Sequence, residues 1–416
     1  MKLHSSETAD DTRKVKLAYL VSHPIQYQAP LLRRISEEPD IDLTVFFGSS
    51  FSVREYTDKG FGVGVKWDVS LLHGYRYEFL PTIRDGQRTG MTCPMNYGIL
   101  SRLRGNGRKP RFDALWVHGY STVNAMHAIL AAKSLGIPVL LRAESWLKDR
   151  KRSGRKLAVK RLFFKGLGEL VDGAMPIGTL NAAYWRHYLG DDFPLFPFPY
   201  AVDNDYFQRR SREARDGRAK LLEELKLEPG RPVILFASKL QSRKRCGDLL
   251  EAYRNLTVGP SHKAPPYLVI VGDGQERAEL ESRAKASGLD GVRFCGFRNQ
   301  SELPGFFDLA TVFVLPSRHE PWGLIVNEVM NAGRAVIVSD DVGCQPDLVT
   351  DGVEGCVFRA GDVTSLTDAL RRVLATPETA MRMGERGLER IRTWSFEEDI
   401  RGVRQALAEV TRKITA

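Results

Sequence analysis

Cysteine is scarce in this sequence, and no two cysteines lie close together. The 416 residues include five cysteines, and no Cys-x-x-Cys pair occurs among them. This spacing excludes a zinc ribbon and a dithiol redox site, and it excludes a disulfide-stapled scaffold. An odd number of scattered thiols is typical of a reducing compartment, so we expect a cytoplasmic protein.

Long apolar runs are also missing. No stretch approaches the roughly 18 apolar residues that a membrane-spanning helix needs. Residues 1–16 are polar and contain no apolar signal core, which argues against secretion. Any association with a membrane is therefore expected to be peripheral.

The composition present is that of a folded protein with two domains. Hydrophobic residues make up 43% of the chain and charged residues 27%, as in ordinary globular proteins. The length is about two to three times that of a single domain. The net charge of +10, from 61 basic and 51 acidic side chains, favours anionic partners such as phosphates or an acidic membrane surface.

Short apolar segments alternate with stretches of helical spacing in both halves of the chain. In the first half, strands are predicted at 14–22, 43–47, 115–117 and 139–141, with helices at 31–38 and 123–135. In the second half, strands are predicted at 233–237, 267–271, 292–295, 312–315 and 335–338, with helices at 248–256 and 276–287. This alternation predicts an α/β protein with two doubly wound parallel sheets, each covered by helices on both faces.

A cluster of prolines marks the join between the halves. Pro194, Pro197 and Pro199 fall within a short stretch and disfavour helix there. We therefore predict a first domain over residues 1–200 and a second over residues 201–394. Helical periodicity over 397–414 predicts a final helix.

Ligands of open parallel sheets bind beyond the carboxyl ends of the strands, so the loops that follow strands are the candidate sites. The strongest is residues 315–333, where a strand ends and a helix begins near Leu324. Free amides of that first turn, with Gly323, predict an anion site. Glu320 and Glu328 bracket the turn, and carboxylates there suit sugar hydroxyls better than phosphate. As an isolated pair they would be solvated acids, but the strand–Pro–Gly–helix setting favours a binding role.

A basic cluster follows the strand at 233–237. Lys239, Arg243, Lys244 and Arg245 could neutralise a diphosphate without a metal ion. The alternative is a solvated basic loop, which a charge run alone would favour about equally.

Two glycines, Gly272 and Gly274, follow the strand at 267–271. The position expected for a third glycine holds Arg277, which disfavours a hydride-transferring dinucleotide enzyme. A tight turn close to a nucleotide is the remaining interpretation.

These elements, in this order, resemble the family 4 retaining glycosyltransferases of the GT-B fold. The resemblance covers most of the second half, from about Val233 to Val373. Glu320 to Glu328 reproduces the family's Glu-x7-Glu spacing, and residues 238–245 stand where the family carries Gly-Arg-Leu-x3-Lys-Gly. The segments 294–297 and 308–317 are similar to the family's turn beside the nucleobase and to its strand entering the donor site.

The resemblance implies a GT-B architecture, with two Rossmann-like domains facing a central cleft. It also implies a hexosyl transfer from a UDP- or GDP-linked sugar to a growing glycan or a lipid-linked acceptor, with retained configuration and with neither metal nor cofactor. The implied catalytic residues are His118, Glu320, Lys239 and Lys244. The implied donor-binding residues are Glu328, Gly323, Leu324, Ile325, Phe297, Arg298 and Gly272. Among them, Glu328 would accept hydrogen bonds from the ribose, and Glu320 would contact the donor sugar.

Two Asp-x-Asp triplets could instead indicate a metal-dependent transferase, which needs such a triplet at the end of a strand. Asp40-Ile41-Asp42 precedes its strand, and Asp203-Asn204-Asp205 is interpreted as a linker turn. We therefore expect no metal site. Residues 394–396 are similar to the family's kink, after which residues 395–416 would return to the first domain.

The first domain is expected to bind the acceptor. His118 ends a strand where the family often places a histidine near the reacting sugar, although a structural histidine is the alternative. His23 and Gln26 follow the first strand, and they either bind the acceptor or form a capped turn. Arg142 and Glu144 lie past another strand end and are predicted to border the same pocket.

The segment Lys148–Lys165 holds nine basic residues and one acidic residue. Within it, Val159, Leu162 and Phe163 have helical spacing, which predicts a basic amphipathic helix that could lie on anionic lipid. The alternative is a helix whose apolar stripe faces the core and whose basic side is solvated. No stacking aromatics are interleaved with the charges, so a nucleic-acid partner is not expected.

Two other functions fit the same features. One is a nucleotide-sugar-binding protein without turnover, and the other is a nucleotide-sugar epimerase of the same fold. Release of nucleoside diphosphate from a donor separates a transferase from both.

Overall fold

Buried apolar runs build a six-stranded sheet in the first half of the chain. The computed structural model describes residues 13–58, 60–86, 89–105, 109–148, 153–257 and 264–415. The strands of this sheet are β1 (Val15–Val21), β2 (Ile41–Phe47), β5 (Arg76–Phe79), β8 (Ala114–His118), β9 (Val139–Arg142) and β10 (Gly173–Ala174). They pair in the order β10-β9-β8-β1-β2-β5, and every pairing is parallel. Apart from the edge strand β5, which is partly exposed, these strands are almost continuously buried, as is typical of parallel strands covered on both faces.

Helices cover this sheet, and short hairpins extend from it. The helices are α1 (Ala29–Ser36), α2 (Ile99–Arg104), α3 (Val123–Ser134), α4 (Gly154–Gly168) and α5 (Thr179–Leu189). The hairpins pair β3 (Tyr56–Asp58) with β4 (Val63–Val65), and β6 (Thr82–Arg84) with β7 (Met95–Asn96). None of these four hairpin strands was predicted, because each is only two or three residues long.

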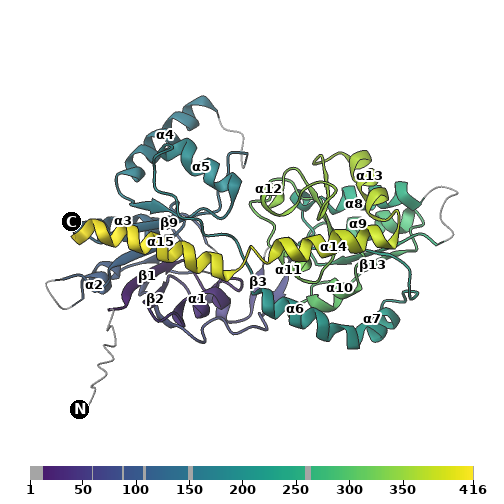
Figure 1. The fold of residues 1–416 in the computed structure, drawn as a ribbon, viewed down its shortest axis with the longest axis horizontal. Coiled ribbons are helices and arrows are strands. Elements are labelled where there is room, and N and C mark those ends of the chain that lie inside the picture. The colour runs from purple at the N-terminus through teal and green to yellow at the C-terminus, as the bar shows by residue number, and fades with distance from the viewer. Residues whose placement is uncertain are drawn as a thin grey trace, which may run out of the picture.

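A second six-stranded parallel sheet follows in the other half. Its strands are β11 (Val233–Ala237), β12 (Tyr267–Val271), β13 (Val292–Phe294), β14 (Val312–Leu315), β15 (Ala335–Ser339) and β16 (Gly355–Phe358). Around it lie α6 (Asn204–Glu213), α7 (Arg218–Glu224), α8 (Cys246–Thr257), α9 (Arg277–Ala286), α10 (Leu303–Leu309), α11 (Ile325–Asn331), α12 (Gln345–Leu348), α13 (Val363–Val373) and α14 (Pro377–Ile391). The predicted pair of doubly wound sheets is confirmed (Figure 1).

Both sheets reverse their strand order at an equivalent place. The second sheet runs β13-β12-β11-β14-β15-β16, so the order reverses between β11 and β14. In the first sheet the reversal lies between β1 and β8. Ligands bind in the crevice that such a switch point opens beyond the strand ends. The fold therefore brings the loops after β11 and β14 together, and those after β1 and β8.

The chain crosses between the two domains twice. The first crossing precedes α6, where the Asp203 carboxylate accepts a hydrogen bond from the Tyr206 amide at 2.8 Å and caps the helix. The interpretation of residues 203–205 as a linker turn was therefore wrong, since Asn204 and Asp205 form the first turn of α6.

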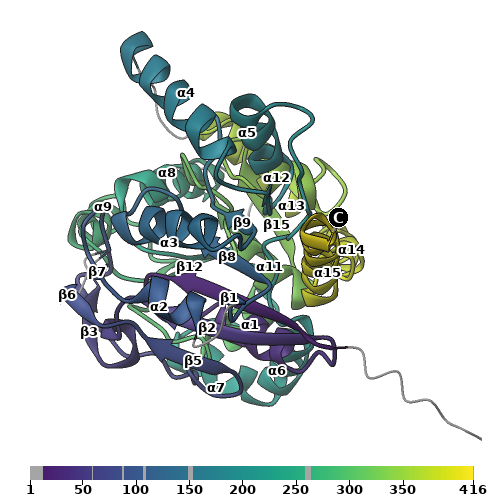
Figure 2. The ribbon, with the colours of Figure 1, turned by 90° about the vertical axis from the view of Figure 1, so that its left-hand side faces the viewer.

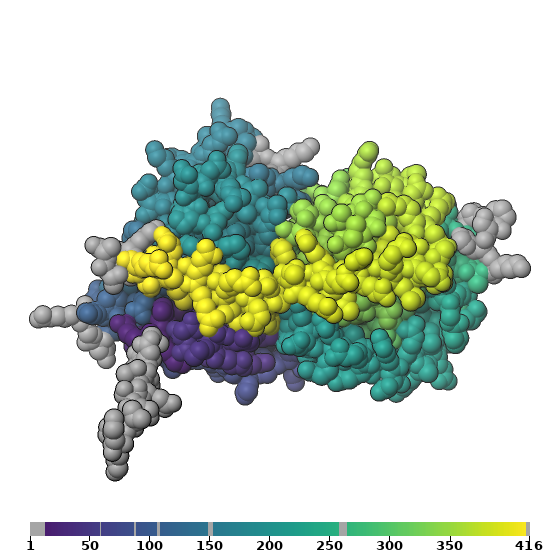
Figure 3. Space-filling model, viewed as in Figure 1, coloured from purple at the N-terminus to yellow at the C-terminus, as the bar shows by residue number. Residues whose placement is uncertain are grey.

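The second crossing leads into α15 (Phe396–Thr415), which runs back along the first domain (Figures 1 and 3). Ile400, Val403 and Leu407 of α15 are buried in the same core as Leu17 and Trp116. Before the helix starts, the Trp394 ring stacks on Trp322 with centroids 5.4 Å apart. A tryptophan stack thus fixes the point at which the chain leaves the second domain.

The docking of α15 depends on a glycine. A Cβ atom at Gly402 would lie 1.8 Å from the Pro197 carbonyl oxygen, so the helix touches the crossing segment backbone to backbone. We expect Gly402→Ala to lower the free energy of unfolding by about 1–3 kcal/mol, because overpacking forces the helix outward. Gly166→Ala in α4 is the matched control, since a Cβ there meets nothing within 4 Å. Urea denaturation of both variants checks this, and a Gly402→Ala variant as stable as the wild type would contradict it.

Candidate functional site

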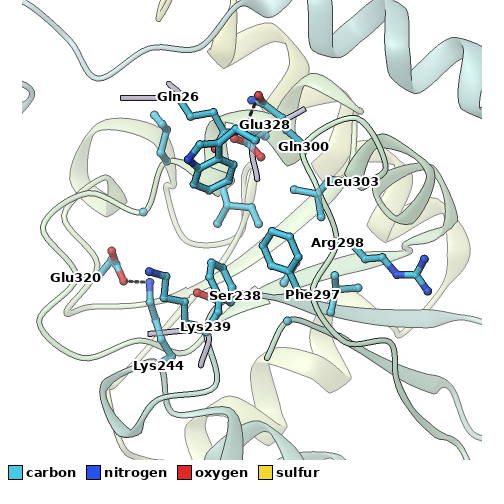
Figure 4. Close-up of a pocket in the computed structure, with 18 of the residues that line it drawn as sticks. Gln26, Ser238, Lys239, Lys244, Phe297, Arg298, Gln300, Leu303, Glu320 and Glu328 are labelled. Carbon is cyan, nitrogen blue, oxygen red and sulfur yellow. Dashed lines mark hydrogen bonds and ion pairs between the residues drawn. The ribbon is translucent and has the colours of Figure 1, made fainter. Parts of the chain in front are cut away.

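A cavity of about 270 Å³ lies where the loops after β11 and β14 meet (Figure 4). Its walls contain these ten residues of the predicted donor side: Lys239, Lys244, Gly272, Phe297, Arg298, Glu320, Gly323, Leu324, Ile325 and Glu328. The first domain contributes Gln26, Phe61 and Trp67 to the same walls. The cavity is therefore shared between the domains.

A buried ion pair forms one wall of this cavity. Lys244 ends a short turn after β11 and is only 8% exposed, and its ammonium donates to the Glu320 carboxylate. The Arg243 guanidinium donates to the same carboxylate oxygen at 3.1 Å. Burial lowers the pKa of Lys244, while the charge of Glu320 acts in the opposite direction. The site thus holds two cations against one carboxylate, an arrangement with spare positive charge for an anion.

The second lysine of the cavity contacts the other domain. Lys239 follows β11, and its ammonium donates to both Asp58 carboxylate oxygens, at 2.8 and 2.9 Å. Burial alone would raise the pKa of Asp58, but the hydrogen bond and charge of Lys239 bring it below its ordinary value. The ammonium also lies 4.7 Å from the centre of the Phe61 ring. Lys239, which the sequence assigns to a diphosphate, is therefore ion-paired with a carboxylate of the first domain.

Glycines let the loops of the cavity approach one another. A Cβ at Gly272 would lie 1.9 Å from the Ser238 carbonyl oxygen, so only glycine permits the contact between the β11 and β12 loops. Gly323 has a φ of 93°, a conformation that favours glycine, and it begins the turn into α11. In both cases the missing Cβ atom would meet protein atoms, at Gly323 the Leu315 and Val342 side chains, so the glycines permit close packing of the loops that line the cavity.

Glu328 faces the cavity from α11. Burial raises the pKa of this carboxyl to about 8. A group at this position changes charge easily near neutral pH, and its charged form is stabilised by any ligand that donates hydrogen bonds to it.

Two aromatic rings, one from each domain, line the cavity near the loop after β13. The Phe61 and Phe297 rings meet edge to face, with centroids 4.8 Å apart. Beside them, Gln26 donates to the Gln300 side chain at 2.8 Å. Figure 4 shows this glutamine pair at one end of the cavity and the Lys244–Glu320 pair at the other. Arg298 lines the wall, and its guanidinium donates to Glu302 at 3.1 Å.

A second site surrounds His118 at the switch point of the first sheet. Tyr19 and Gln28 contact its Nδ1 at 3.2 and 3.1 Å, while its Nε2 lies 3.7 Å from Glu144. Tyr200 donates to the Glu144 carboxylate at 2.7 Å. Burial would raise the pKa of Glu144, but His118, Tyr200 and the charge of Arg142 lower it to about 2. Glu144 is therefore a fixed negative charge beside the histidine.

A groove of about 790 Å³ extends from His118 and Glu144 to α4. Lys156, Lys160 and Phe163 of α4 form its other wall. Pro321 also lines this groove, whereas its neighbours Glu320 and Gly323 line the donor-side cavity. The two spaces therefore meet at a single loop.

Three residues predicted for the acceptor side do not line the groove at His118. Gln26 is in the wall of the donor-side cavity. His23 hydrogen-bonds Ser22 at 2.8 Å and stacks on Phe51, and burial lowers its pKa to about 4. Arg142 is only 2% exposed, because its guanidinium is covered by the Phe198 and Tyr200 rings at 4.5 and 5.0 Å.

The sequence did not point to Asp58, Phe61 or Trp67. They follow or belong to the short β3–β4 hairpin, which carries neither helical nor strand periodicity. The only local signal is the Asp-Lys-Gly-Phe-Gly run at 58–62, which is rich in turn residues.

Comparisons with known proteins agree with this geometry. Residues 217–390 match the family model described as glycosyl transferases group 1. A stretch of 183 residues is 34% identical to alpha-D-kanosaminyltransferase of Streptomyces kanamyceticus, covering 44% of this chain and 46% of that protein. The chain thus spans about half the length of that curated relative.

Solved structures resemble the whole chain. Sucrose-phosphate synthase of Thermosynechococcus elongatus superposes with a TM-score of 0.67 at 18% identity, covering 97% of this chain and 99% of that one. The Anabaena HepE protein, in complex with UDP and glucose, gives 0.67 at 14% identity over 95% of this chain and 100% of that one. The fold is GT-B. The predicted architecture is therefore confirmed. Each of the two sheets described above, together with the helices that cover it, forms one Rossmann-like domain.

The Asp58–Lys239 pair yields a testable expectation. Asp58→Asn should raise the affinity for inorganic pyrophosphate about threefold, because an ion pair that is still partly exposed to solvent is worth up to about 1 kcal/mol and its loss frees Lys239. Asp68→Asn is the matched control, since Asp68 also bridges the domains, through Ser301, but contacts no cation of the cavity. Isothermal titration calorimetry measures both. Equal pyrophosphate affinity in the wild type and Asp58→Asn would contradict competition at Lys239.

Proposed function

We propose that this chain is a retaining glycosyltransferase that moves a sugar from a UDP- or GDP-linked donor to a glycan or lipid-linked acceptor. The observation that carries the proposal is the shared cavity, in which Lys239 and Lys244 lie beside Glu320 and Glu328 at a switch point. The match of residues 217–390 to glycosyl transferases group 1 covers the same loops and supports it.

The cations of the cavity suit the diphosphate of such a donor. Cleavage of the sugar–phosphate bond leaves additional negative charge on the departing phosphate. Fixed cations at this point, here Lys239, Arg243 and Lys244, stabilise that charge as it develops. The proposal therefore includes no metal ion and no cofactor.

The remaining walls suit the other parts of the donor. Glu328 would accept hydrogen bonds from the ribose hydroxyls, and Glu320 would contact hydroxyls of the transferred sugar. Phe297 and Arg298 would lie beside the nucleobase. Gly272, Gly323, Leu324 and Ile325 would bring the backbone close to the diphosphate.

The groove at His118 and Glu144 would hold the acceptor. Because one loop borders both spaces, with Pro321 on the groove and Glu320 on the donor-side cavity, an acceptor hydroxyl in the groove would approach the sugar from the side that the leaving group vacates. Attack on that face retains the anomeric configuration. The Glu144 carboxylate, whose pKa is about 2, can accept a hydrogen bond from the acceptor hydroxyl across the working pH range.

The direct test is incubation with a panel of UDP- and GDP-sugars in the presence of a chelator. We expect nucleoside diphosphate to be released from one donor, slowly into water and faster with acceptor glycans. The anomeric configuration of the product is then read by NMR. Tight donor binding with no release under any acceptor would support a binding protein, and formation of an epimeric nucleotide sugar would support an epimerase.

Lys244 should stabilise mainly the transition state in which the bond between the sugar and the phosphate breaks. We expect Lys244→Ala to lower kcat by about 100-fold or more, since removing one fixed electrostatic donor typically has an effect of that size. The dissociation constant of the intact donor should rise by less, because much of the phosphate charge appears only on departure. Steady-state kinetics give the change in kcat and calorimetry gives the change in the dissociation constant. The melting temperature of the variant shows whether it is folded. Equal losses in binding and in rate would argue against this role.

Glu328 should make donor binding depend on pH. Its pKa of about 8 means that most of the carboxyl is protonated at pH 7, whereas ribose hydroxyls favour the ionised form. Donor affinity should therefore rise about eightfold from pH 7 to pH 8.5 and then level off. Glu328→Gln should bind the donor more weakly and with no such rise. Calorimetric titrations of the donor from pH 7 to above pH 8.5 test this. If the affinity of Glu328→Gln rose with pH as steeply as that of the wild type, Glu328 would be excluded as the titrating group.

A further inference from the structure

Helix α4 carries two sets of apolar side chains, one buried and one largely exposed. Phe164 and Leu167 are 0% and 1% exposed and pack into the core of the first domain. Val159 and Leu162 are 70% and 72% exposed, and Phe163 is 38% exposed. Val159 and Leu162 thus do not serve the core, and Phe163 does so only with the part of its ring that contacts Tyr120 and Phe164.

Basic residues border this exposed stripe. At 100° per residue, positions 159, 162 and 163 share one face, with 156 on one side and 161 and 165 on the other, and Arg155 lies one turn before Val159 on the same face. Arg155, Lys156, Arg161 and Lys165 are all exposed. No acidic residue occurs between Gly154 and Gly168. An exposed apolar ridge between basic rows is the pattern of a helix that lies in a lipid interface.

Exposed apolar side chains are concentrated on the first domain. Of the thirteen large hydrophobic residues exposed in the described part of the chain, eleven belong to the first domain, and only Val353 and Met381 to the second. Figure 2 shows α4 projecting from the first domain, away from both sheets. Among the described residues, no helix has the length and apolarity that crossing a bilayer requires.

We propose that α4 docks the protein on an anionic lipid bilayer. Val159, Leu162 and Phe163 would enter the interface, and the flanking arginines and lysines would contact lipid phosphates. Of the predicted basic segment Lys148–Lys165, residues 149–152 lie outside the described part of the chain, so the docking surface is defined by residues 155–165.

Docking through α4 would place the acceptor groove at the membrane. Lys156, Val159 and Phe163 belong both to this surface and to the groove that ends at His118 and Glu144. A lipid-linked acceptor could then enter the groove without leaving the bilayer, a consequence that rests on the proposed transfer function. Vesicle binding itself needs no donor, so the two proposals can fail separately.

The experiment is co-sedimentation with vesicles of phosphatidylcholine alone and of an equimolar mixture with phosphatidylglycerol. We expect the full chain to bind the mixed vesicles, to ignore the neutral ones, and to dissociate as NaCl is raised. Leu162→Ser and the double variant Arg161→Gln, Lys165→Gln should each lower the partition coefficient about tenfold. Met381→Ser and the pair Arg382→Gln, Arg386→Gln, exposed on the second domain, are matched controls that should bind as the wild type does.

Several outcomes would overturn the docking proposal. They are no wild-type binding, binding to neutral and anionic vesicles alike, or equal losses in the α4 variants and the controls. A wild-type dimer that Leu162→Ser converts to monomers, seen by sedimentation velocity, would assign the ridge to a second copy of the chain. Donor hydrolysis is measured in parallel, and neither Leu162, Arg161 nor Lys165 lines the described cavities of the site. Vesicle loss with hydrolysis unchanged supports docking, whereas absent hydrolysis in every protein counts only against the transferase.

Discussion

The contact between Lys244 and Glu320 organises the loops around the donor-side cavity. The two residues follow β11 and β14, which are neighbours in the sheet, and their side chains are only 10% and 11% exposed. Removing Glu320 would leave the buried Lys244 ammonium without its carboxylate, at a cost of about 3–5 kcal/mol. The Arg318 amide also donates to the Arg243 carbonyl at 2.7 Å. The two loops are therefore tied together, and the cationic wall and the turn into α11 behave as one unit.

The two lysines of the cavity differ in what holds them. Lys244 is paired within its own domain, whereas the partner of Lys239 is Asp58 in the other domain. In the proposed reaction a diphosphate competes with both carboxylates. Exchange at Lys239 alters a contact between domains, while exchange at Lys244 does not. Donor binding and the relative position of the domains are thus coupled through Lys239 in particular.

The position of a residue could be predicted where it follows from the residue's own strand. Apolar runs predicted both sheets, and residues just beyond β11 and β14 had to meet, because neighbouring parallel strands end at one edge. Asp58 and Phe61 were not predicted, because their positions depend on contacts across the domains. Arg142 is also at a strand end, but rings from the crossing segment cover it, which its local sequence cannot reveal.

Helix α4 shows the same limit in another form. Its sequence offers two apolar sets, and periodicity alone does not choose which of them faces the core. The structure selects Phe164, whose ring packs between Tyr184, Tyr188 and Trp185. The aromatic partners on α5, and not the residue spacing within α4, therefore determine which apolar set of α4 is buried.

Tyr200 joins the acceptor side to the donor side. Its hydroxyl donates to Glu144, and its carbonyl oxygen accepts from Asn327 of α11 at 3.0 Å and from Trp394 at 3.1 Å. One residue of the crossing segment therefore links the acceptor carboxylate, the helix that carries Glu328 and the start of the second crossing. A motion that separated the domains at this point would break either the contact with Glu144 or those with Asn327 and Trp394. Tyr200 therefore ties the two domains together at the crossing, while the Lys239–Asp58 ion pair is a separate contact between them.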